Sequence, residues 1–530
     1  MRHYVTLSDG RQLHVRIDGH GPAVLVLHDW PMSGAVASEL TTALPFPHTV
    51  VSPDSPGYGQ SHHDGDPLDL AGHARVLVEL MAHLGADEYA VVGTGLGAVL
   101  AIAVAAEARA RVTTVLIDAI PSNAALARLD PELLAPLSEP RHSGSHVLDV
   151  WHQVRDAAIF DPWHDVAASR RLSRSVPDPR TLHRRAADVL RAPGPWRDGI
   201  AAALSFDVDA AVGQVFGPVI RVLDSHDFRG VVPQSVVPDP ERLAVGLATA
   251  AHHGGTSRRY VRTSGGTVHV RLDGDPAAPP VLVLHPSPGS ADTYRDVIAD
   301  LAADFLVVGM DLIGNGYSDK SGLPDPEIAD YAAVASEALE QLALGPAIVF
   351  GSHTGASVAL EVASRRPDLT AGLVVEGLGH FTGPEQADVL NHYTPHHAPV
   401  HSGAHLVDQW HMLRDMHLFW PWYSSTTANL RDTAPTLDGL HNLFVQMVKT
   451  GVTYPLAYRA AFRHDPRPAA ASLTAPGFFT AHAADMLRDS TEALAGLAPS
   501  VDFAELAPAE GRGAAWAVRT FAGEGISQTA

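Results

Sequence analysis

The sequence contains no cysteine, and this absence excludes several kinds of chemistry at once. A chain without cysteine forms no disulfide bonds, has no thiolate nucleophile and offers no thiolate ligand to a metal. Positive charge is also scarce: 37 Lys and Arg stand against 59 Asp and Glu, which gives a formal net charge of −22. That balance argues against nucleic acid and anionic membranes as partners, and leaves a small molecule as the expected one.

Long apolar runs are missing as well. No stretch is long enough to span a bilayer, and residues 1–10 do not have the character of a signal peptide. Together with the lack of cysteine, this predicts a cytoplasmic protein with no membrane partner. At 530 residues and 46% hydrophobic content, the chain is long enough for two domains, each with its own core.

A glycine-flanked turn follows a buried apolar run at two places. Ile348 to Phe350 lead into Gly-Ser-His-Thr-Gly with His353 in the middle, and Ala90 to Val92 lead into Gly-Thr-Gly-Leu-Gly with Gly95 in the middle. The two middle residues are 353 − 95 = 258 positions apart. A second motif, Asp-x-x-Gly-x-Gly-x-Ser, starts at Asp54 and again at Asp311, which is 311 − 54 = 257 positions later. This spacing predicts a tandem duplication of one fold.

The turn resembles the nucleophile elbow of the α/β-hydrolase fold, in which a buried strand bends sharply into a helix. The resemblance covers nearly the whole chain twice. It implies an α/β protein with two tandem domains, each a mostly parallel sheet flanked by helices and carrying an inserted helical cap. The expected domains are 1–255, with a cap at about 121–209, and 256–530, with a cap at about 380–468. They are expected to form an internal pseudo-dimer, and a homo-oligomer stays open.

The resemblance also shows what both halves lack. Family members usually carry Ser, Asp or Cys at the elbow, and the second half instead resembles an atypical group with His-Thr-Gly there. The family's base histidine falls at Arg512, whose guanidinium stays protonated and cannot act as a base. Covalent catalysis is therefore not expected in either half, and the first half, with Gly95 at its elbow, is expected to be degenerate.

Acid–base chemistry at His353 remains, because an unperturbed imidazole titrates near neutral pH. Asp485, at the place of the family's catalytic acid, and Glu376, at a strand end, are alternative partners for its ring. The backbone N–H groups of Thr354 and Ser287 are expected to hold an oxyanion or enolate. Arg512 is a candidate for binding a carboxylate or phenolate.

The second cap contains a His-rich segment that repeats one in the first cap. Within it, His405 and Trp410 either contact the substrate or pack the cap helix, and the sequence leaves both open. No carboxylate or cysteine completes a metal-ligand spacing among these histidines, so neither a metal nor an organic cofactor is expected. In the first half, Trp30, Asp118 and Asp227 are expected to line a ligand pocket.

The main hypothesis is a cofactor-independent enzyme in which His353 acts on a small, largely apolar, carbonyl-bearing substrate, and a biosynthetic pathway is its expected setting. Lyase, isomerase or cyclase chemistry fits the His353 imidazole best, and hydrolysis through an activated water stays open. One alternative is a non-catalytic ligand-binding or scaffold protein. Another places hydrolysis in the first half, with a water activated by Asp227 and His253.

Overall fold

The computed structural model describes most of the chain, in two compact units. The described residues are 1–41, 47–61, 67–118, 121–127, 139–173, 175–191, 193–221, 256–320, 322–431, 433–507 and 513–526. The first unit comprises Met1–Ala250 and Pro399–Gly403, and the second comprises Ala251–Ala398 and Ala404–Ala530. The predicted domain boundary after residue 255 lies beside residues outside the described set and stays a prediction.

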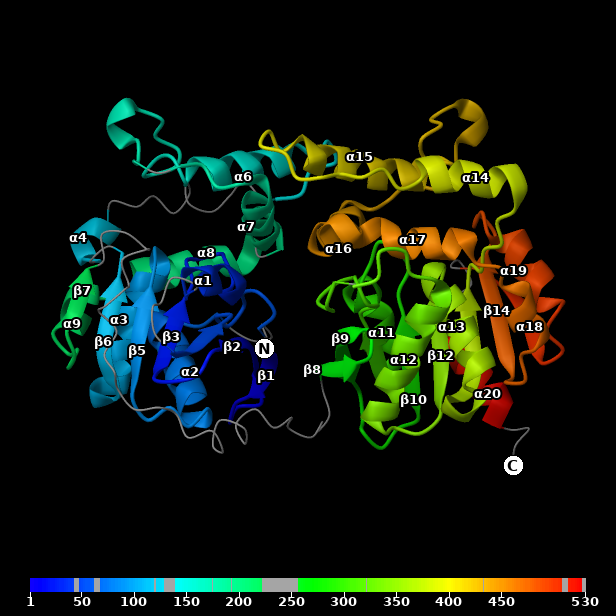
Figure 1. Ribbon diagram of the computed structural model, residues 1–530, viewed down its shortest axis with the longest axis horizontal. Helices are drawn as coiled ribbons and strands as arrows, with labels where there is room; N and C mark the ends of the chain where they lie inside the picture. The colour runs from blue at the N-terminus through cyan, green and yellow to red at the C-terminus, as the bar shows by residue number, and fades with distance from the viewer. Residues whose placement is uncertain are drawn as a thin grey trace. The chain divides into compact units, whose positions relative to one another are not determined.

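The first unit is built on a mixed sheet with strand order β1-β2-β4-β3-β5-β6-β7 in its described part (Figure 1). Its strands are β1 (Arg2–Thr6), β2 (Gln12–Asp18), β3 (Ala23–Leu27), β4 (Thr49–Pro53), β5 (Tyr89–Gly93), β6 (Val112–Ile117) and β7 (Val219–Arg221). The antiparallel pairings are those of β1 with β2 and of β2 with β4, at one edge of the sheet. The remaining neighbours, in the spatial order β4, β3, β5, β6, β7, pair in parallel. β3 and β5 are buried on both faces, which their uninterrupted apolar sequences predict.

The first unit's helices flank this sheet or belong to its cap. They are α1 (Gly34–Thr41), α2 (Leu70–His83), α3 (Leu96–Ala108), α4 (Asn123–Leu126), α6 (Ser145–Asp156), α7 (Pro179–Arg191), α8 (Pro193–Leu204) and α9 (Val208–Val212). Two short 3-10 turns, Arg109–Arg111 and Ala168–Arg170, complete the set. The segment from α4 to α9 lies between β6 and β7, where the sequence predicts an inserted cap.

The second unit repeats this order and adds one strand, giving β8-β9-β11-β10-β12-β13-β14-β15 in its described part. Its strands are β8 (Thr256–Thr263), β9 (Gly266–Asp273), β10 (Pro280–Leu284), β11 (Leu306–Met310), β12 (Ala347–Ser352), β13 (Thr370–Glu376), β14 (Gly477–His482) and β15 (Val501–Leu506). Again the antiparallel pairings lie at one edge, between β8 and β9 and between β9 and β11, and the other neighbouring strands pair in parallel. The matching orders confirm two mostly parallel α/β sheets in tandem.

Helices cover both faces of the second sheet, and a cap lies over the end at which β12 leads into α13 (Figure 1). The helices are α11 (Arg295–Leu301), α12 (Ile328–Leu342), α13 (Thr354–Arg365), α14 (Gly383–His392), α15 (Ala404–Leu418), α16 (Leu437–Thr450), α17 (Tyr454–Arg463), α18 (Arg467–Ala471), α19 (Arg488–Ala495) and α20 (Ala514–Ile526). Short 3-10 turns span Ala291–Tyr294, Pro367–Leu369, Thr427–Asn429 and Gly451–Thr453.

The alternation of side chains along β10 divides the second unit's core into two layers. Leu282 and Leu284 pack with residues of α12 and α13, whereas Val281 and Val283 pack with residues of α11 and α20. This alternation is what a strand buried on both faces requires. The sheet therefore packs between two layers of helices. This packing holds in place the strand ends that carry the candidate site.

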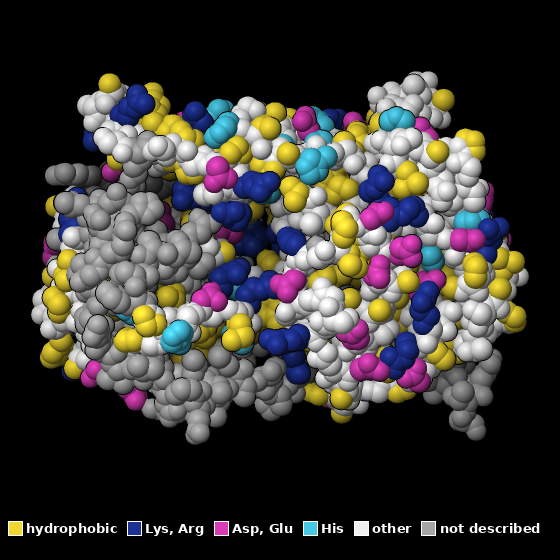
Figure 2. All heavy atoms as spheres, viewed as in Figure 1, with side chains coloured by type: hydrophobic (Ala, Val, Ile, Leu, Met, Phe, Trp, Pro, Cys, Tyr) yellow, Lys and Arg dark blue, Asp and Glu magenta, His cyan; other side chains and the backbone are white. Residues whose placement is uncertain are grey.

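On the surface of the second unit, side chains of both charge signs are interspersed on the face seen in Figure 2. Large exposed hydrophobic side chains such as Leu323, Val452 and Leu497 come from separate segments of the chain. Among the described residues, no helix has the length and apolar character needed to cross a bilayer.

Candidate active site

The elbow of the second unit is formed by the end of β12 and the start of α13. Every residue of β12 is buried, and the chain turns at His353 with φ 51° and ψ −110°. A Cβ on Gly351 would lie 2.2 Å from the Gly355 carbonyl oxygen, and a Cβ on Gly355 would lie 2.2 Å from the Leu284 oxygen. Both glycines are therefore required by space, and the bend between them projects His353 out of the sheet.

The His353 imidazole has one neighbour at each ring nitrogen. Its Nε2 lies 3.4 Å from Asp485 Oδ2, and its Nδ1 lies 2.9 Å from Ser352 Oγ. Ser352 is 1% exposed, whereas the His353 side chain is 40% exposed. The buried Ser352 hydroxyl group covers Nδ1, whereas the 3.4 Å between Nε2 and Asp485 Oδ2 is longer than an ordinary N–H···O hydrogen bond, so we take Nε2 as the nitrogen available for proton exchange with a bound molecule.

Asp485 reaches the ring from the loop that follows β14. Its side chain is largely buried, and its Oδ1 accepts a hydrogen bond of 2.9 Å from the Leu487 backbone N–H. Gly377 gives the pair space, since a Cβ there would lie 2.8 Å from Asp485 Oδ2 and 3.1 Å from His353 Cε1. The carboxylate is thus held where it can stabilise a positive charge on the imidazole ring.

The other proposed partner, Glu376, directs its carboxylate elsewhere. Its Oε2 accepts a hydrogen bond of 3.0 Å from the Tyr294 hydroxyl, and its Oε1 lies 3.2 Å from His482 Nε2. Its connection to the elbow is through the backbone, since the His353 N–H donates to the Glu376 carbonyl oxygen at 2.8 Å. Glu376 therefore holds the elbow through its backbone carbonyl group, while Asp485 is the carboxylate beside the His353 ring.

Glu376 and His482 stabilise each other's charged forms. Burial alone would raise the pKa of Glu376, but the hydrogen bond from His482 and the nearby His353 bring that pKa below its usual value. The same hydrogen bond raises the pKa of His482. Burial, reinforced by the Glu376 charge, raises the pKa of Tyr294 and keeps its hydroxyl neutral.

Thr354 and Ser287 occupy the positions predicted for an oxyanion site. Thr354 is the first residue of α13, and Ser287 lies in the loop after β10; both are buried. His285 holds that loop, because its Nδ1 lies 2.7 Å from the Pro286 carbonyl oxygen and its Nε2 accepts from the Leu312 N–H at 3.0 Å. In the described part of the chain, no acceptor takes a hydrogen bond from the Thr354 or Ser287 backbone N–H.

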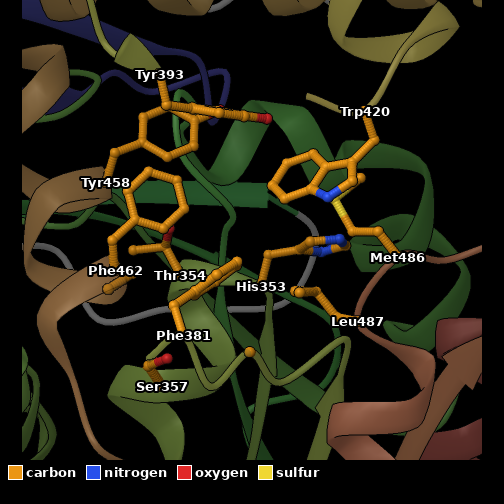
Figure 3. A pocket seen from close by; sticks show the side chains of 12 residues that line it. His353, Thr354, Ser357, Phe381, Tyr393, Trp420, Tyr458, Phe462, Met486 and Leu487 are labelled. Carbon is orange, nitrogen blue, oxygen red and sulfur yellow. The ribbon is translucent and has the colours of Figure 1, made fainter. Parts of the chain in front are cut away.

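A cavity opens beside the His353 ring. The cap and the loops at the strand ends supply most of its walls, and the start of α13 supplies its base. Its lining residues are His353, Thr354, Ser357, Gly379, Phe381, Tyr393, Trp420, Tyr458, Ala461, Phe462, Met486 and Leu487. Figure 3 shows the imidazole pointing toward Trp420 and Met486, with Tyr393, Tyr458 and Phe462 on the opposite side. The elbow histidine thus faces an aromatic-walled cavity.

His405 and Trp410, like Ser287, Asp485 and Glu376, are not among the described residues that line this cavity. His405 and Trp410 lie on α15 and are 3% and 0% exposed, and the Trp410 ring packs edge-on against Phe444 at 5.3 Å. In this position they pack the cap, which is the alternative the sequence left open. Arg512 lies outside the described residues.

The elbow of the first unit has the same backbone but different contents. Gly95 turns with φ 58° and ψ −128° ahead of α3, much as His353 does ahead of α13. The Asp29 carboxylate fills the space beside it, because a Cβ on Gly95 would lie 2.3 Å from Asp29 Cγ. The Leu96 N–H, which corresponds to that of Thr354, donates to Asp29 Oδ1 at 2.8 Å. The oxyanion position of the first unit is therefore occupied by the protein itself.

A second carboxylate lies at this elbow. The Gly95 N–H is 3.3 and 3.2 Å from the two oxygens of Asp118, which follows β6. Burial raises the pKa of Asp29 to about 6, and the negative charge of Asp118 adds to this rise. The hydrogen bonds from the Leu96 and Trp30 backbone N–H groups act in the opposite direction.

The remaining residues predicted for a first-half pocket are placed as follows. The Trp30 side chain is buried, and its ring stacks on Tyr58 with centroids 5.1 Å apart. This packing directs the ring into the unit's interior. Asp227 and His253 lie outside the described residues, so a water activated by that pair stays a prediction.

Sequence reasoning missed several residues around the two elbows. Tyr294 and His482 come from separate segments, and only the fold brings them to Glu376. A strand-end position is the one signal that could have singled out His482. Asp29 stands at the position where the family usually has glycine, but its place beside Gly95 depends on a side-chain orientation that spacing does not give.

Comparisons with known proteins agree with the duplicated fold. Residues 22–138 and 279–410 match the family described as alpha/beta hydrolase fold. With the two matching sheets, this places the chain in the α/β-hydrolase superfamily, with the fold present twice.

Individual relatives match only parts of the chain. Haloalkane dehalogenase 2 of Mycobacterium tuberculosis is 34% identical over 117 residues, which are 22% of this chain and 40% of the dehalogenase. The soluble epoxide hydrolase of Corynebacterium sp. is 32% identical over 91 residues, 17% of this chain and 32% of that enzyme. Among solved structures, epoxide hydrolase A from Mycobacterium thermoresistibile is similar with a TM-score of 0.38 and 20% identity, over 48% of this chain and 92% of that one. This chain therefore spans less than half the length of the two curated relatives.

Proposed function

We propose that the second unit is a cofactor-independent enzyme in which His353 transfers protons to and from a small, largely apolar, carbonyl-bearing substrate. The observation that carries this proposal is the half-exposed imidazole at the elbow, with Asp485 3.4 Å from its Nε2 and an aromatic cavity beside it. A titratable group held in a cavity next to a buried carboxylate is a frequent arrangement of functional sites.

In the proposed reaction, His353 Nε2 takes a proton from the carbon next to the substrate carbonyl group. The electrons of the broken C–H bond move to the carbonyl oxygen and form an enolate, while Asp485 stabilises the imidazolium. The Thr354 and Ser287 backbone N–H groups hold the enolate oxygen. Return of the proton to another atom gives isomerisation, and departure of a group from the neighbouring carbon gives elimination. Cyclisation uses the same enolate, whose carbon adds to a second carbonyl group of the substrate. C–C cleavage differs, because His353 would take the proton of a hydroxyl group on the β-carbon, the C–C bond between the α- and β-carbons would break, and its electrons would form the enolate while the β-carbon leaves as a carbonyl compound.

Hydrolysis remains a related possibility within this proposal. His353 would remove a proton from a water molecule, the water oxygen would add to the carbonyl carbon, and the same backbone N–H groups would hold the resulting oxyanion. Collapse of this oxyanion would break the bond to the leaving group, which takes the proton back from the imidazolium. The relatives' names, haloalkane dehalogenase and epoxide hydrolase, support hydrolytic chemistry in general terms. The histidine at the elbow is the reason for preferring chemistry without a covalent intermediate.

We assign the first unit a supporting role. Gly95 offers no side chain, and the Asp29 carboxylate takes the hydrogen bond from Leu96 that a substrate oxygen would need. These same features support the alternative, a non-catalytic binding or scaffold protein. A cytoplasmic location, an internal pseudo-dimer and the absence of nucleic acid or membrane partners are further parts of the proposal.

The experiment that tests the site is a crystal structure with 1-naphthol, a stable planar mimic of an enol. The expected complex has the naphthol oxygen about 2.7–3.1 Å from the backbone nitrogens of Thr354 and Ser287, with its ring in the cavity. The adjacent ring carbon should lie about 3–3.5 Å from His353 Nε2. A ligand bound in the cavity with its oxygen directed away from His353 would refute the proposed chemistry.

A further inference from the structure

The walls of the second unit's cavity are unusually uniform in chemistry. Five of its lining residues are aromatic, and Met486, Leu487 and Ala461 add apolar surface. The aromatic residues come from three places: Phe381 and Tyr393 near α14, Trp420 after α15, and Tyr458 and Phe462 on α17. A ligand in this cavity is therefore surrounded by ring faces and edges on several sides (Figure 3).

The aromatic wall is braced by contacts among its own rings. The Tyr393 ring lies 5.4 Å from Trp420, 5.5 Å from Tyr458 and 5.1 Å from Phe462, measured between centroids. The Phe381 ring packs edge-on against Phe462 at 5.1 Å. Since each ring is held by at least one other, the wall is formed before a ligand arrives, which lowers the entropy cost of binding.

The cavity is also poor in charge. Its lining includes no Lys, Arg, Asp or Glu side chain among the described residues, and His353 is its one imidazole. Burial raises the pKa of Tyr393 and of Tyr458, so both hydroxyls stay neutral. An ion entering this cavity would lose its hydration without gaining a charged side-chain partner from the wall.

Polar groups gather at one end. His353 and Thr354 lie together at the elbow, and Ser357 follows on the next turn of α13. At the cap, the Tyr458 hydroxyl is directed to the Met416 sulfur at 3.8 Å. This asymmetry suits a molecule with one polar end and an apolar body.

We propose that the second unit binds an uncharged ligand with a planar aromatic ring system and a single carbonyl or enol oxygen at one end. The ring lies among Phe381, Tyr393, Trp420 and Phe462, and the oxygen faces His353 and Thr354. This inference rests on the proposed function for the choice of a carbonyl group at the elbow, and it adds aromaticity and neutrality to the substrate class.

The test compares four probes of similar shape by isothermal titration calorimetry on the full chain. The probes are 1-tetralone, its saturated analogue 1-decalone, the anion 1-naphthoate and the cation phenyltrimethylammonium. Contacts between aromatic rings strengthen binding beyond what area burial gives, so we expect 1-tetralone to bind about tenfold more tightly than 1-decalone. Equal affinities for these two ketones would overturn the aromatic preference, and tightest binding of either ion would overturn neutrality.

Two variants test where the probe binds. Trp420→Leu should weaken 1-tetralone binding about tenfold and remove its advantage over 1-decalone, whereas Trp516→Leu should leave both affinities unchanged. Trp516 packs against Phe478 and is not among the residues that line the cavity, so it controls for loss of a tryptophan in the same unit. An unaltered preference in a folded Trp420→Leu protein would overturn the assignment.

The outcomes separate this inference from the proposed function. If 1-tetralone binds with the expected preference but no proton exchange depends on His353, the ligand class stands and the chemistry fails. If exchange depends on His353 for aliphatic ketones as readily as for aromatic ones, the chemistry stands and the ligand class fails.

Discussion

The two elbows of this chain share one frame and differ in what fills it. In each unit, a buried histidine after the central strand fixes the next loop: His28 Nε2 accepts from the Ser55 N–H, and His285 Nε2 accepts from the Leu312 N–H, both at 3.0 Å. In each unit, a buried aspartate also accepts a hydrogen bond from the first backbone N–H of the helical segment that follows the loop after this central strand. Those bonds are Gly34 N to Asp54 Oδ1 at 2.7 Å and Ala291 N to Asp311 Oδ1 at 2.8 Å.

The difference lies in two pairs of equivalent positions. Gly95 and Asp29 in the first unit stand where His353 and Pro286 stand in the second. In the first unit the Asp29 carboxylate accepts the elbow N–H, and an apical side chain would collide with it. In the second, the proline has no polar side chain to offer and the apex carries an imidazole. A duplicated frame can therefore keep its fold while two side chains decide whether the site is closed or open.

The largest expected effect comes from closing the second elbow in the way the first is closed. Pro286→Asp places a carboxylate beside the Thr354 N–H, where it competes with the substrate oxygen. Loss of an oxyanion donor costs roughly 10²–10³-fold in rate, so the α-proton exchange of 1-tetralone should fall by about that factor. Nuclear magnetic resonance in D₂O measures this rate. Pro286→Ala is the control and should retain most of it; equal losses in both variants would contradict the comparison.

A smaller loss is expected from neutralising the carboxylate beside His353. Asp485→Asn removes the charge that stabilises the imidazolium, which should slow exchange roughly 10- to 100-fold. Asp489→Asn changes a nearby exposed carboxylate on α19 and serves as the matched control. An exchange rate that stays at the wild-type value in a folded Asp485→Asn protein would remove Asp485 from the proposed chemistry.

In the first unit, Asp29 makes a specific prediction about pH. Its pKa in the folded chain is about 6, above the ordinary value of 3.8 for an aspartate, so the folded state holds the proton more tightly. The contribution of this group to stability is greatest below pH 3.8 and is lost as the pH rises to 6, by up to about 3 kcal/mol.

Asp29→Asn removes this titration. The unfolding free energy of the wild type minus that of the variant should decline between pH 4 and 6 and level off above 7, as measured by urea unfolding. The subtraction cancels the contributions of other carboxylates. A difference that is constant across this range would show that Asp29 does not titrate as the burial at the elbow requires.

The smallest expected effect is the coupling between Asp29 and residue 95. Gly95→Ala should displace the carboxylate in the wild type but meet free space in Asp29→Gly. The cost of Gly95→Ala should therefore be about 1 kcal/mol lower in the Asp29→Gly background, whereas the strain of a positive φ is present in both and cancels. Additive costs in this double-mutant cycle would mean that the two residues do not share the space.

The sequence was sufficient to predict the duplicated fold. Glycines at fixed spacing, apolar runs such as 281–284 and the repeated Asp-x-x-Gly-x-Gly turn are local signals, and each constrains the backbone directly. The position of His353 at the apex follows from the same signals. The cavity next to it depends on cap residues that reach the elbow through tertiary packing, which local patterns do not report.

Side-chain partners were the part that sequence could not supply. Asp485 and Glu376 are equivalent candidates by position, and only the fold places the Asp485 carboxylate beside the imidazole and Glu376 between Tyr294 and His482. His405 lies in the cap segment that the sequence singles out for a substrate contact, yet it faces the inner side of its helix and is buried within the cap. The catalytic roles of all these residues stay predictions.

The central claim is that the His353 imidazole removes a proton from a bound carbonyl compound, and the α-hydrogen exchange of 1-tetralone in D₂O tests it most directly. General acid–base catalysis contributes roughly 10²–10⁴-fold, so the wild type should accelerate exchange and a folded His353→Ala protein should lose at least about 10²-fold of that acceleration. His392→Ala, at an exposed histidine on α14, should exchange at the wild-type rate. Equal rates in the wild type and in His353→Ala would contradict the account.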